Sequence, residues 1–541
     1  MQASGTAAIG ADGLRQGLTP RPMPVGAPSV VALLDMLDGQ QGTAIIDRDG
    51  AMSYAELLAA VDAAAAGLQA RGVAPGKVVA GSAPNCAMLI VAFLATQRLG
   101  AIWLGVNRAL APPEKTELLR DSGAGLFLAP ADILAQVAGL IDPAVRTLTM
   151  ASDDGAFEAL VAAHKGERPA PTPCDPLAPA IIGYTSGTTG TPKGVVHSQH
   201  SMMAFPNACL ASDQGGQWRS GLVRALSISL TIMNGMIYGP LAALASRGTY
   251  VAIDRGDAGG IGEWVDRHGI QVLNSATPTI RDLLVKQDLQ HLSLKSLEAV
   301  AVGGGPVDEV VLDAFKARFG FEIIVDYGIT ESPAGMASSR IERRRKPGFV
   351  GIAHPHLALA VMDGNGRELP RGEVGELCAG PRRDGDWAGV YTGMLGYWRK
   401  PDETRAAFHG AWLRTGDMAK MDDEGHIAIV GRKKEMILRG GANIYPAEVE
   451  RVLNANERVM EAVVVGTPDE RLGQIVTAYV QLRPNVAVEP GLRGYLDDYC
   501  RGQLARYKVP ERWFVIDDIP RNAMNKAQKN LISTVPATPL D

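Results

Sequence analysis

The residues of this chain best suited to chemistry form a short run of hydroxyls and glycines that ends in a lysine. Glycine lets the main chain approach phosphate oxygens closely, and hydroxyls and backbone amides can bind those oxygens. The run follows an apolar stretch at residues 180–182, which indicates a loop after a strand. Because Gly194 follows the lysine where a Walker A loop has serine or threonine, this is a different kind of phosphate loop. We predict that a triphosphate binds at Thr185, Ser186, Gly187, Thr188, Thr189, Gly190 and Lys193.

A second group of polar residues lies directly after the apolar stretch 323–325. It combines Asp326, Tyr327 and Gly328 with the adjacent hydroxyl–carboxylate pair Thr330 and Glu331. A ring, a glycine and such a pair at the C-terminal end of a strand suit nucleotide binding. Taken alone, the pair could instead begin a helix, but together with the first loop it favours a nucleotide site.

The motifs and their order resemble those of the adenylate-forming superfamily, which includes acyl-CoA synthetases, luciferases and the adenylation domains of peptide synthetases. The resemblance extends from about Met52 to Lys529. It implies ATP as a substrate, with Tyr327 beside adenine, Thr330 at the α-phosphate and Glu331 at a magnesium ion. Magnesium prefers oxygen ligands and takes few of them from the protein, so one glutamate suffices.

The resemblance assigns further nucleotide contacts along the chain. Asp417 would accept hydrogen bonds from both ribose hydroxyls, and the guanidinium of Arg432 would contact ribose or phosphate. Gly304, after the apolar stretch 299–302, would form part of the wall of the adenine and acyl pocket. The same site is expected to include Gly305, Pro306, Asp326, Gly328 and Ile429.

Adenylation is expected to depend on Lys526, which by resemblance bridges the substrate carboxylate and the α-phosphate. A compact cation there would neutralise the charge that develops on phosphorus. Asn525 stands where most relatives have glycine, and Lys529 is a nearby competitor that ranks below Lys526. The expected catalytic residues are Thr185, Lys193, Glu331 and Lys526.

The resemblance also implies a second half-reaction. The C-terminal domain would rotate about a hinge at Lys434 and bring the loop 440–446 to a tunnel for the thiol of coenzyme A. Glu435 stands where aspartate is more usual. The expected products are acyl-CoA, AMP and pyrophosphate, so the resemblance implies an AMP-forming carboxylic acid–CoA ligase.

Alternating strand and helix patterns through about residue 330 predict α/β sheets with parallel pairing. Ser53 is a candidate helix cap with Glu56 in the capping-box position, and residues 357–380 indicate a β-rich subdomain. We therefore predict an α/β fold with a large N-terminal domain of two α/β subdomains plus a β-rich subdomain. A small mobile α+β C-terminal domain follows, and the expected domains are residues 1–433 and 434–541.

The uncharged stretch from Ala225 to Ser246 is expected to form a buried helix beside an apolar pocket, because Pro240 and several polar residues argue against a membrane span. It offers no Arg, Lys or His for a dicarboxylate and no Asp for the ammonium group of an amino acid. We predict a neutral apolar monoacid as substrate: medium-chain, branched or alicyclic. The expected lining is Ser227, Ile228, Ser229, Met233, Asn234, Ile237, Gly304, Gly305 and Ala334.

Composition narrows the class of protein further. A chain of 541 residues with 46% hydrophobic and 21% charged residues suits an ordinary enzyme of two or three domains. The net charge of -5 gives no support for a nucleic-acid partner. Five scattered cysteines argue against a zinc site or disulfide framework and fit a reducing compartment, so we expect a cytoplasmic protein. Residues 1–28 are expected to form a loose arm rather than a signal peptide.

Other functions stay open on the sequence alone. An adenylating ligase whose acceptor is an amine would form an amide, and a regulatory nucleotide-binding protein would catalyse nothing. The joint presence of Lys526, Glu331 and Asp417 argues against the regulatory protein, and luciferase-type oxidation is not favoured. Homodimers are common among relatives, but no stretch of the sequence shows an interface.

Overall fold

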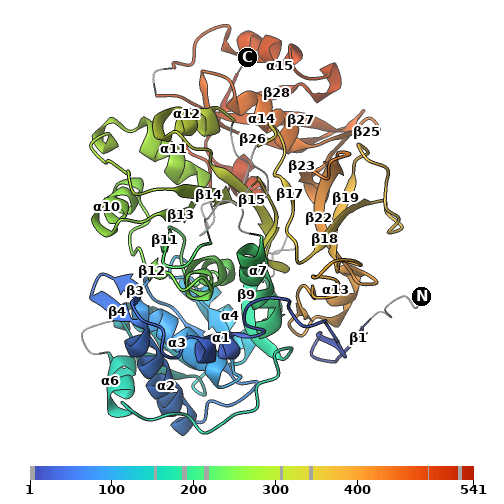
Figure 1. Cartoon of the computed structure of the whole chain (residues 1–541). Coiled ribbons are helices and arrows are strands. Elements are labelled where there is room, and N and C mark those ends of the chain that lie inside the picture. The colour runs from blue at the N-terminus through green and yellow to red at the C-terminus, as the bar shows by residue number, and fades with distance from the viewer. Residues whose placement is uncertain are drawn as a thin grey trace.

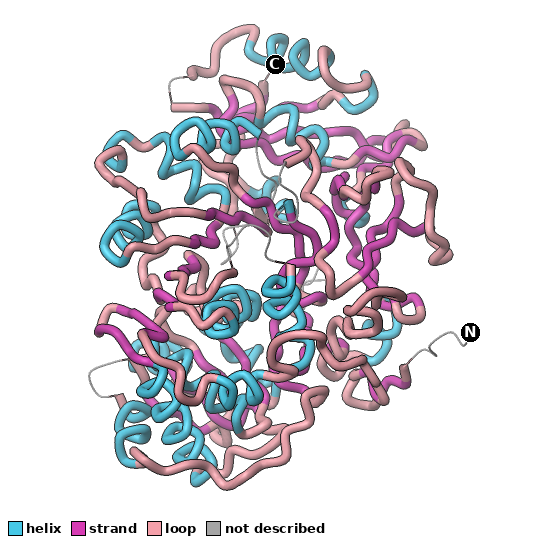
Figure 2. The backbone as a smooth tube through the Cα atoms, viewed as in Figure 1, coloured by secondary structure: helices cyan, strands magenta, loops and turns pink. Residues whose placement is uncertain are grey.

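The computed structural model describes residues 7–151, 155–185, 192–212, 218–304, 309–339, 345–484, 486–521 and 527–540. In Figure 1 the N-terminal elements lie at the bottom, the strands β18 to β23 at the right and the C-terminal elements at the top. Helices surround the strands in the lower and left parts, whereas strands dominate on the right (Figure 2). The predicted succession of two α/β subdomains, a β-rich subdomain and a smaller C-terminal α+β unit is confirmed.

The first sheet has seven strands in the order β20-β10-β9-β6-β5-β7-β8. Its inner pairs are parallel, and at one edge β9 turns back into the antiparallel strand β10. Helix α2 begins at the predicted capping box of Ser53 and Glu56. The strands are β5 Val78–Gly81, β6 Ile102–Gly105, β7 Ala124–Ala129, β8 Arg146–Thr149, β9 Pro179–Thr185, β10 Lys193–Ser198 and β20 Gly396–Tyr397. The helices are α2 Tyr54–Ala70, α3 Ala87–Arg98, α4 Pro112–Ser122, α5 Ala131–Val137, α6 Ala156–Ala163 and α7 Gln199–Ala211.

The second sheet has nine strands in the order β17-β16-β15-β14-β13-β11-β12-β3-β4. Thr330 and Glu331 occupy the turn between β15 and β16, so this pair does not begin a helix. The strands are β3 Thr43–Asp47, β4 Gly50–Ser53, β11 Val223–Leu226, β12 Thr249–Val251, β13 Val272–Ser275, β14 Ala299–Gly303, β15 Ile324–Ile329, β16 Ser332–Ser338 and β17 Ile352–Ala353. The helices are α1 Val30–Met36, α10 Ala258–His268, α11 Thr277–Val285, the 3-10 turn η2 Gln287–Leu289 and α12 Glu309–Phe319.

The β-rich part is a five-stranded antiparallel sheet in which β22 pairs with β19, β21 and β23. The C-terminal unit has a sheet of six strands, and a cluster of buried apolar side chains drawn only from residues 437–540 forms its core. The β-rich part comprises β18 Ala358–Met362, β19 Gly375–Gly380, α13 Pro401–Ala406, β21 Phe408–His409, β22 Trp412–Met421 and β23 Ile427–Arg432. The rest comprises η4 Lys433–Glu435, β24 Ile437–Arg439, β25 Ala442–Ile444, α14 Pro446–Asn454, β26 Val459–Asp469, β27 Gly473–Leu482, α15 Leu492–Arg501, η5 Arg506–Lys508, β28 Arg512–Val515, η6 Lys529–Thr534 and β29 Thr538–Pro539.

The uncharged stretch predicted as one helix is helical only in its second half. Strand β11 ends at Leu226, a loop follows at 227–232, and the helical segments are α8 Met233–Met236, the π-helical turn η1 Ile237–Leu241 and α9 Ala242–Ala245. The wide turn contains Pro240, which has no amide hydrogen to donate to an α-helical ladder. No helix among the described ranges is long and apolar enough to cross a bilayer.

The prediction of a loose N-terminal arm is wrong for residues 7–28. The arm forms a small hairpin of β1 Ala8–Ile9 and β2 Arg15–Gln16 and then runs along the segment near residue 390. The Arg15 amide donates to the Leu395 carbonyl at 2.8 Å, and the Arg21 amide donates to the Gly389 carbonyl at 2.9 Å. Composition did not predict this, because the contacts join residues more than 360 positions apart.

Candidate active site

The two ends of the predicted phosphate loop lie opposite each other. Thr185 ends β9 and pairs in register with Lys193, the first residue of β10. The Nζ atom of Lys193 lies 5.2 Å from the centre of the ring of Tyr397, on the neighbouring strand β20. An aromatic face stabilises a cation without neutralising its charge, so this lysine keeps its attraction for phosphate. The predicted residues Ser186, Gly187, Thr188, Thr189 and Gly190 lie outside the described residues.

Glu331 is held from two sides at the turn between β15 and β16. The Met394 amide donates to the Glu331 carbonyl at 3.0 Å, and the Tyr397 hydroxyl donates to Glu331 Oε1 at 2.8 Å. Within the described ranges, the Glu331 carboxylate forms no ion pair with a side chain. A half-buried carboxylate of this kind offers the hard oxygen ligand that Mg²⁺ prefers, so the residues present fit the predicted metal.

A buried histidine supports the other residue of this turn. His197, which has no exposed surface, donates from Nε2 to the Thr330 carbonyl at 2.8 Å. Burial lowers the pKa of His197 to about 4. The ring is therefore neutral near pH 7, and it holds Thr330 without placing a second positive charge beside the phosphate site.

Acidification is expected to destabilise the protein through His197. Its pKa is about 4 when folded against 6.5 when exposed, so the unfolded chain binds the extra proton more readily. The stabilisation is complete above pH 6.5 and is lost as the pH falls toward 4, by about 3 kcal/mol at most. Thermal melts of wild type and His197→Gln between pH 7.5 and 4.5 measure this effect. Equal pH dependence of the two melting temperatures would contradict it.

The predicted ribose carboxylate is buried with two partners. Asp417 is 3% exposed; its Oδ2 accepts a hydrogen bond from the Tyr327 hydroxyl at 2.6 Å, and its Oδ1 lies 2.7 Å from Arg432 Nε. Burial and the charge of Asp417 raise the pKa of Tyr327 well above 10, so the phenol stays protonated and donates. The structure thus brings together Tyr327, which was assigned to adenine, Asp417, assigned to ribose, and Arg432, assigned to ribose or phosphate.

The proposed hinge lies beside the same groups. Lys434 is in η4, directly after β23, which contains Ile429 and ends at Arg432. Partial burial lowers the pKa of Lys434, and the positive charge of Arg432 lowers that pKa further. The negative charges of Glu435, Asp417 and Glu331 act in the opposite direction. The carboxylates of Asp417 and Glu331, the predicted ribose and magnesium ligands, therefore both stabilise the charged form of Lys434.

Among the residues predicted to line the acyl pocket, the hydroxyls are hydrogen-bonded to neighbouring hydroxyls. Ser227 and Ser275 lie at the ends of neighbouring strands, and their Oγ atoms are 2.8 Å apart. Ser229 Oγ and Thr231 Oγ1 are 2.7 Å apart. Hydroxyls that are hydrogen-bonded to each other do not require a polar ligand, because they keep these hydrogen bonds when an apolar ligand lies beside them.

Helix α8, the turn η1 and strand β16 carry other residues that are predicted to line the acyl pocket. Met233 and Ile237 are buried, and Asn234 Oδ1 accepts a hydrogen bond from the Ala334 amide at 3.3 Å. Ala334 has a φ of 64°, and its carbonyl would lie 2.3 Å from a Cβ atom on Gly328. Only glycine fits at position 328, so the sequence signal there is a packing requirement. Ile228 is half-buried nearby in the loop that precedes the helix.

Several predicted residues cannot be placed. Gly305, Pro306 and Lys526 lie outside the described residues, and Gly304 is exposed at the end of β14. The competitor Lys529 lies 2.9 Å from Glu435 and 2.8 Å from Glu450. Burial alone would lower the pKa of Lys529, but these two carboxylates raise it. An ammonium held between two carboxylates is poorly suited to bind a phosphate, which supports ranking Lys529 below Lys526.

Sequence reasoning missed three residues that position the site: Tyr397, His197 and Asn85. Asn85 Nδ2 donates to the carbonyls of Ile228 and Ile253, and its Oδ1 accepts from the Leu230 amide at 2.8 Å. It therefore fixes the loop that carries Ser227 and Ser229. None of the three belongs to a local pattern of chemical residues, so only the fold reveals them.

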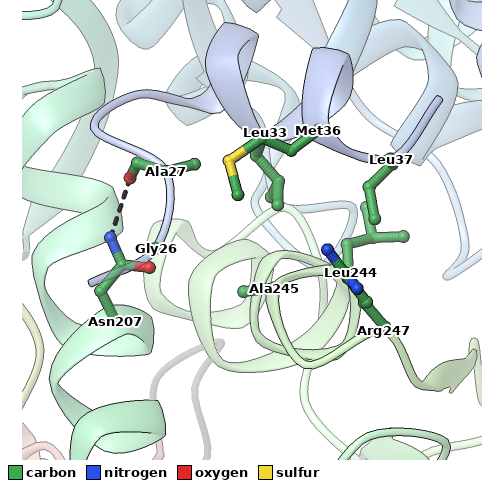
Figure 3. Close-up of a pocket in the computed structure, with 9 residues that line it drawn as sticks. All are labelled: Gly26, Ala27, Leu33, Met36, Leu37, Asn207, Leu244, Ala245 and Arg247. Atoms are coloured by element: carbon green, nitrogen blue, oxygen red, sulfur yellow. Dashed lines mark hydrogen bonds between the residues drawn. The ribbon is translucent and has the colours of Figure 1, made fainter.

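A separate cavity of about 210 Å³ lies between the N-terminal arm, α1, α7 and α9. Figure 3 shows Asn207 at one side, with its amide donating to the Ala27 carbonyl, and Arg247 at the other. None of its lining residues belongs to the predicted active site. The cavity is lined by Gly26, Ala27, Leu33, Met36, Leu37, Asn207, Leu244, Ala245 and Arg247.

The sequence of this chain is similar to those of known proteins over nearly its whole length. The indoleacetate–CoA ligase of Aromatoleum aromaticum is 30% identical over 90% of this chain and 94% of its own. The long-chain-fatty-acid–CoA ligase FadD13 of Mycobacterium tuberculosis is 31% identical over 90% of this chain and 93% of its own. Both relatives are therefore similar along nearly their whole length.

Solved structures are similar over the same extent. ATP-bound MatB from Rhodopseudomonas palustris superposes with a TM-score of 0.83 at 28% identity, covering 94% of this chain and 99% of that one. The amide bond synthetase McbA from Marinactinospora thermotolerans gives a TM-score of 0.80 at 27% identity, covering 93% and 99%. The family described as AMP-binding enzyme matches residues 38–398, and that described as AMP-binding enzyme C-terminal domain matches residues 448–526. The chain therefore belongs to the AMP-binding enzyme family, within the adenylate-forming superfamily that its motifs resemble.

Proposed function

We propose that this enzyme activates a carboxylic acid with ATP and transfers the acyl group to coenzyme A. The carboxylate would attack the α-phosphate, pyrophosphate would leave, and an acyl-adenylate would remain. The thiol of coenzyme A would then take the acyl group and release AMP. The observation that carries the proposal is the single ring of Tyr397, which contacts both the phosphate-loop lysine Lys193 and the carboxylate of Glu331.

The roles of the named residues follow from their chemistry. Glu331 would hold Mg²⁺, which when bound supplies positive charge to the phosphates. Lys193 and Lys526 would add fixed cations at the phosphates, and Asp417 would orient the ribose. Because Glu331, Lys193 and Asp417 are each held by a neighbouring side chain, they can stabilise charge with little cost of reorganisation.

We further propose two domains, residues 1–433 and 434–541, with the hinge at Lys434. The separate apolar core of residues 437–540 supports a unit that can move as a body. Rotation about Lys434 would exchange Lys526 for the loop 440–446 and so separate the two half-reactions. All five cysteines are free thiols, which fits the reducing environment of the cytoplasm.

The substrate class that we propose is a neutral apolar monoacid: medium-chain, branched or alicyclic. The paired hydroxyls and the buried Met233 and Ile237 support it, because this lining offers no charge to a second carboxylate or to an ammonium group. The indoleacetate and long-chain fatty acid named for the two relatives are also largely apolar acids.

A panel of acids tests this proposal in a pyrophosphate-release assay. Octanoate and cyclohexanecarboxylate are expected to give higher kcat/KM than acetate or malonate, since each buried methylene contributes about 0.8 kcal/mol. A preference for acetate or malonate would overturn the proposed substrate class. Parallel reactions with and without coenzyme A show whether the thiol accelerates turnover.

The similarity to an amide bond synthetase supports an amine as the alternative acceptor of the acyl group. If the acyl group goes to an amine, pyrophosphate release will ignore coenzyme A and rise with an added amine. The same acid panel, repeated with amines in place of coenzyme A, separates the two ligases.

A further inference from the structure

The N-terminal arm is bonded to the segment that carries Tyr397. The Arg15 guanidinium donates from Nη1 to the carbonyls of Thr392 at 2.7 Å and Met394 at 3.2 Å. It also lies 4.3 Å from the centre of the Phe408 ring. Arg15 is half-buried. A guanidinium that donates to two carbonyls of an irregular segment fixes the path of that segment.

The arm also holds the far side of Tyr397. Thr404 Oγ1 donates to the Gly13 carbonyl at 2.7 Å and accepts from the Tyr397 amide at 2.8 Å. A Cβ atom on Gly13 would lie 2.4 Å from the Tyr397 carbonyl, and one on Gly396 would lie 2.4 Å from the Gly13 carbonyl. The two backbones therefore meet at a distance that only glycine permits.

The segment 392–397 in turn holds Glu331 at two points. Its Met394 amide binds the Glu331 carbonyl, and its Tyr397 hydroxyl binds Oε1 of the carboxylate. With Oε1 engaged in this way, the rotation of the carboxylate about its side chain is restricted.

We propose that Arg15 and Tyr397 are positioning residues for Glu331: the arm sets the path of segment 392–397, and that segment orients the carboxylate toward its metal. This inference rests on the proposed function, in which Glu331 is the magnesium ligand. In this role neither residue would contact the substrate. Their action is indirect, in the way that outer hydrogen bonds orient a metal ligand and tune its affinity.

The matched variants each remove one polar group. Tyr397→Phe deletes the hydroxyl that donates to Glu331. Arg15→Met deletes the guanidinium, and with it the two donations to carbonyls and the contact with the Phe408 ring. Tyr391→Phe is the control for the first, because the Tyr391 hydroxyl donates to Ser332 Oγ, one residue beyond Glu331. Arg21→Met is the control for the second, because Arg21 is an exposed arm residue that binds Gly389 through its backbone amide.

Metal affinity is the decisive readout. Binding of Mn²⁺ with a non-hydrolysable ATP analogue, measured by electron paramagnetic resonance, does not require turnover. Tyr397→Phe is expected to weaken Mn²⁺ binding by about 10- to 100-fold, and Arg15→Met by about 10-fold. The Mn²⁺ affinity of Arg15→Lys is expected to lie between those of the wild type and Arg15→Met. Both controls should bind Mn²⁺ as the wild type does. Wild-type affinity in Tyr397→Phe and Arg15→Met would overturn the inference.

Two further readings keep the result unambiguous. Melting temperatures show whether a variant has lost its fold, and a loss of metal affinity in a variant that melts like the wild type cannot come from unfolding. If the wild type itself shows no acid-dependent pyrophosphate release, the proposed function has failed. If the wild type is active and its Mg²⁺ dependence is unchanged in Tyr397→Phe, only the positioning role has failed.

Discussion

Replacing Lys526 with alanine is expected to lower acid-dependent pyrophosphate release by about 10²- to 10³-fold, the cost of removing one preorganised charge from a transition state. The second half-reaction should survive, because by our proposal Lys526 has left the site when the thiol attacks. Transfer from a synthetic acyl-adenylate to coenzyme A measures that half alone. The two rates, taken on the same preparation, therefore respond differently to a single change.

The comparison variant is Lys529→Ala. Because Lys529 lies between Glu435 and Glu450, its removal leaves the largely buried Glu450 without a cation. The expected result is a lower melting temperature, with no selective loss of adenylation over thioester formation. A selective loss of adenylation in Lys529→Ala but not in Lys526→Ala would reverse our assignment of the two lysines.

Replacing Asp417 with asparagine is expected to raise the KM for ATP by about 10- to 100-fold, since hydrogen bonds to a charged group contribute about 1.5–3 kcal/mol each. The amide can still accept from Tyr327, but it no longer pairs with Arg432 or accepts from both ribose hydroxyls. The KM for the acid should change little. Initial rates at saturating acid and varied ATP measure the effect.

Asp422→Asn provides the matched control at the other end of the same β22–β23 hairpin. Asp422 pairs with Lys346 and with His426, far along the strands from the proposed ribose contact. The control is expected to lower the melting temperature and to leave the KM for ATP unchanged. If both variants raise this KM equally, the effect belongs to the hairpin as a whole and the ribose role of Asp417 is wrong.

The predictable part of the site consists of residues grouped by local pattern. Each of the three residues has a glycine or a hydroxyl beside it in its motif: Thr185 ends β9, Lys193 begins β10, and Glu331 lies in the turn after β15. The capping box at Ser53 was equally legible, because it involves only four consecutive positions. Such features depend on neighbours in the chain, which the sequence displays directly.

The residues that hold these groups in place were not predictable in the same way. Arg15 binds Thr392 across 377 positions, and Tyr397 binds Glu331 across 66. The composition of the arm does not distinguish an arginine that binds a distant segment, such as Arg15, from an arginine that is exposed to solvent. The helix predicted for the uncharged stretch 225–246 was too long for a related reason. A buried strand, a buried loop and a buried helix can all be apolar, so apolarity alone does not distinguish them.

In the function that we propose, one chain makes an acyl-adenylate and then a thioester. The most direct measurement is mass spectrometry of the products after incubation with ATP, Mg²⁺, octanoate and coenzyme A, with omission of each component in turn. We expect octanoyl-CoA and AMP in equal amounts, with octanoyl-adenylate accumulating when coenzyme A is left out. Either of two results would contradict this expectation: release of ADP, or octanoyl-CoA in the complete mixture with no octanoyl-adenylate when coenzyme A is left out.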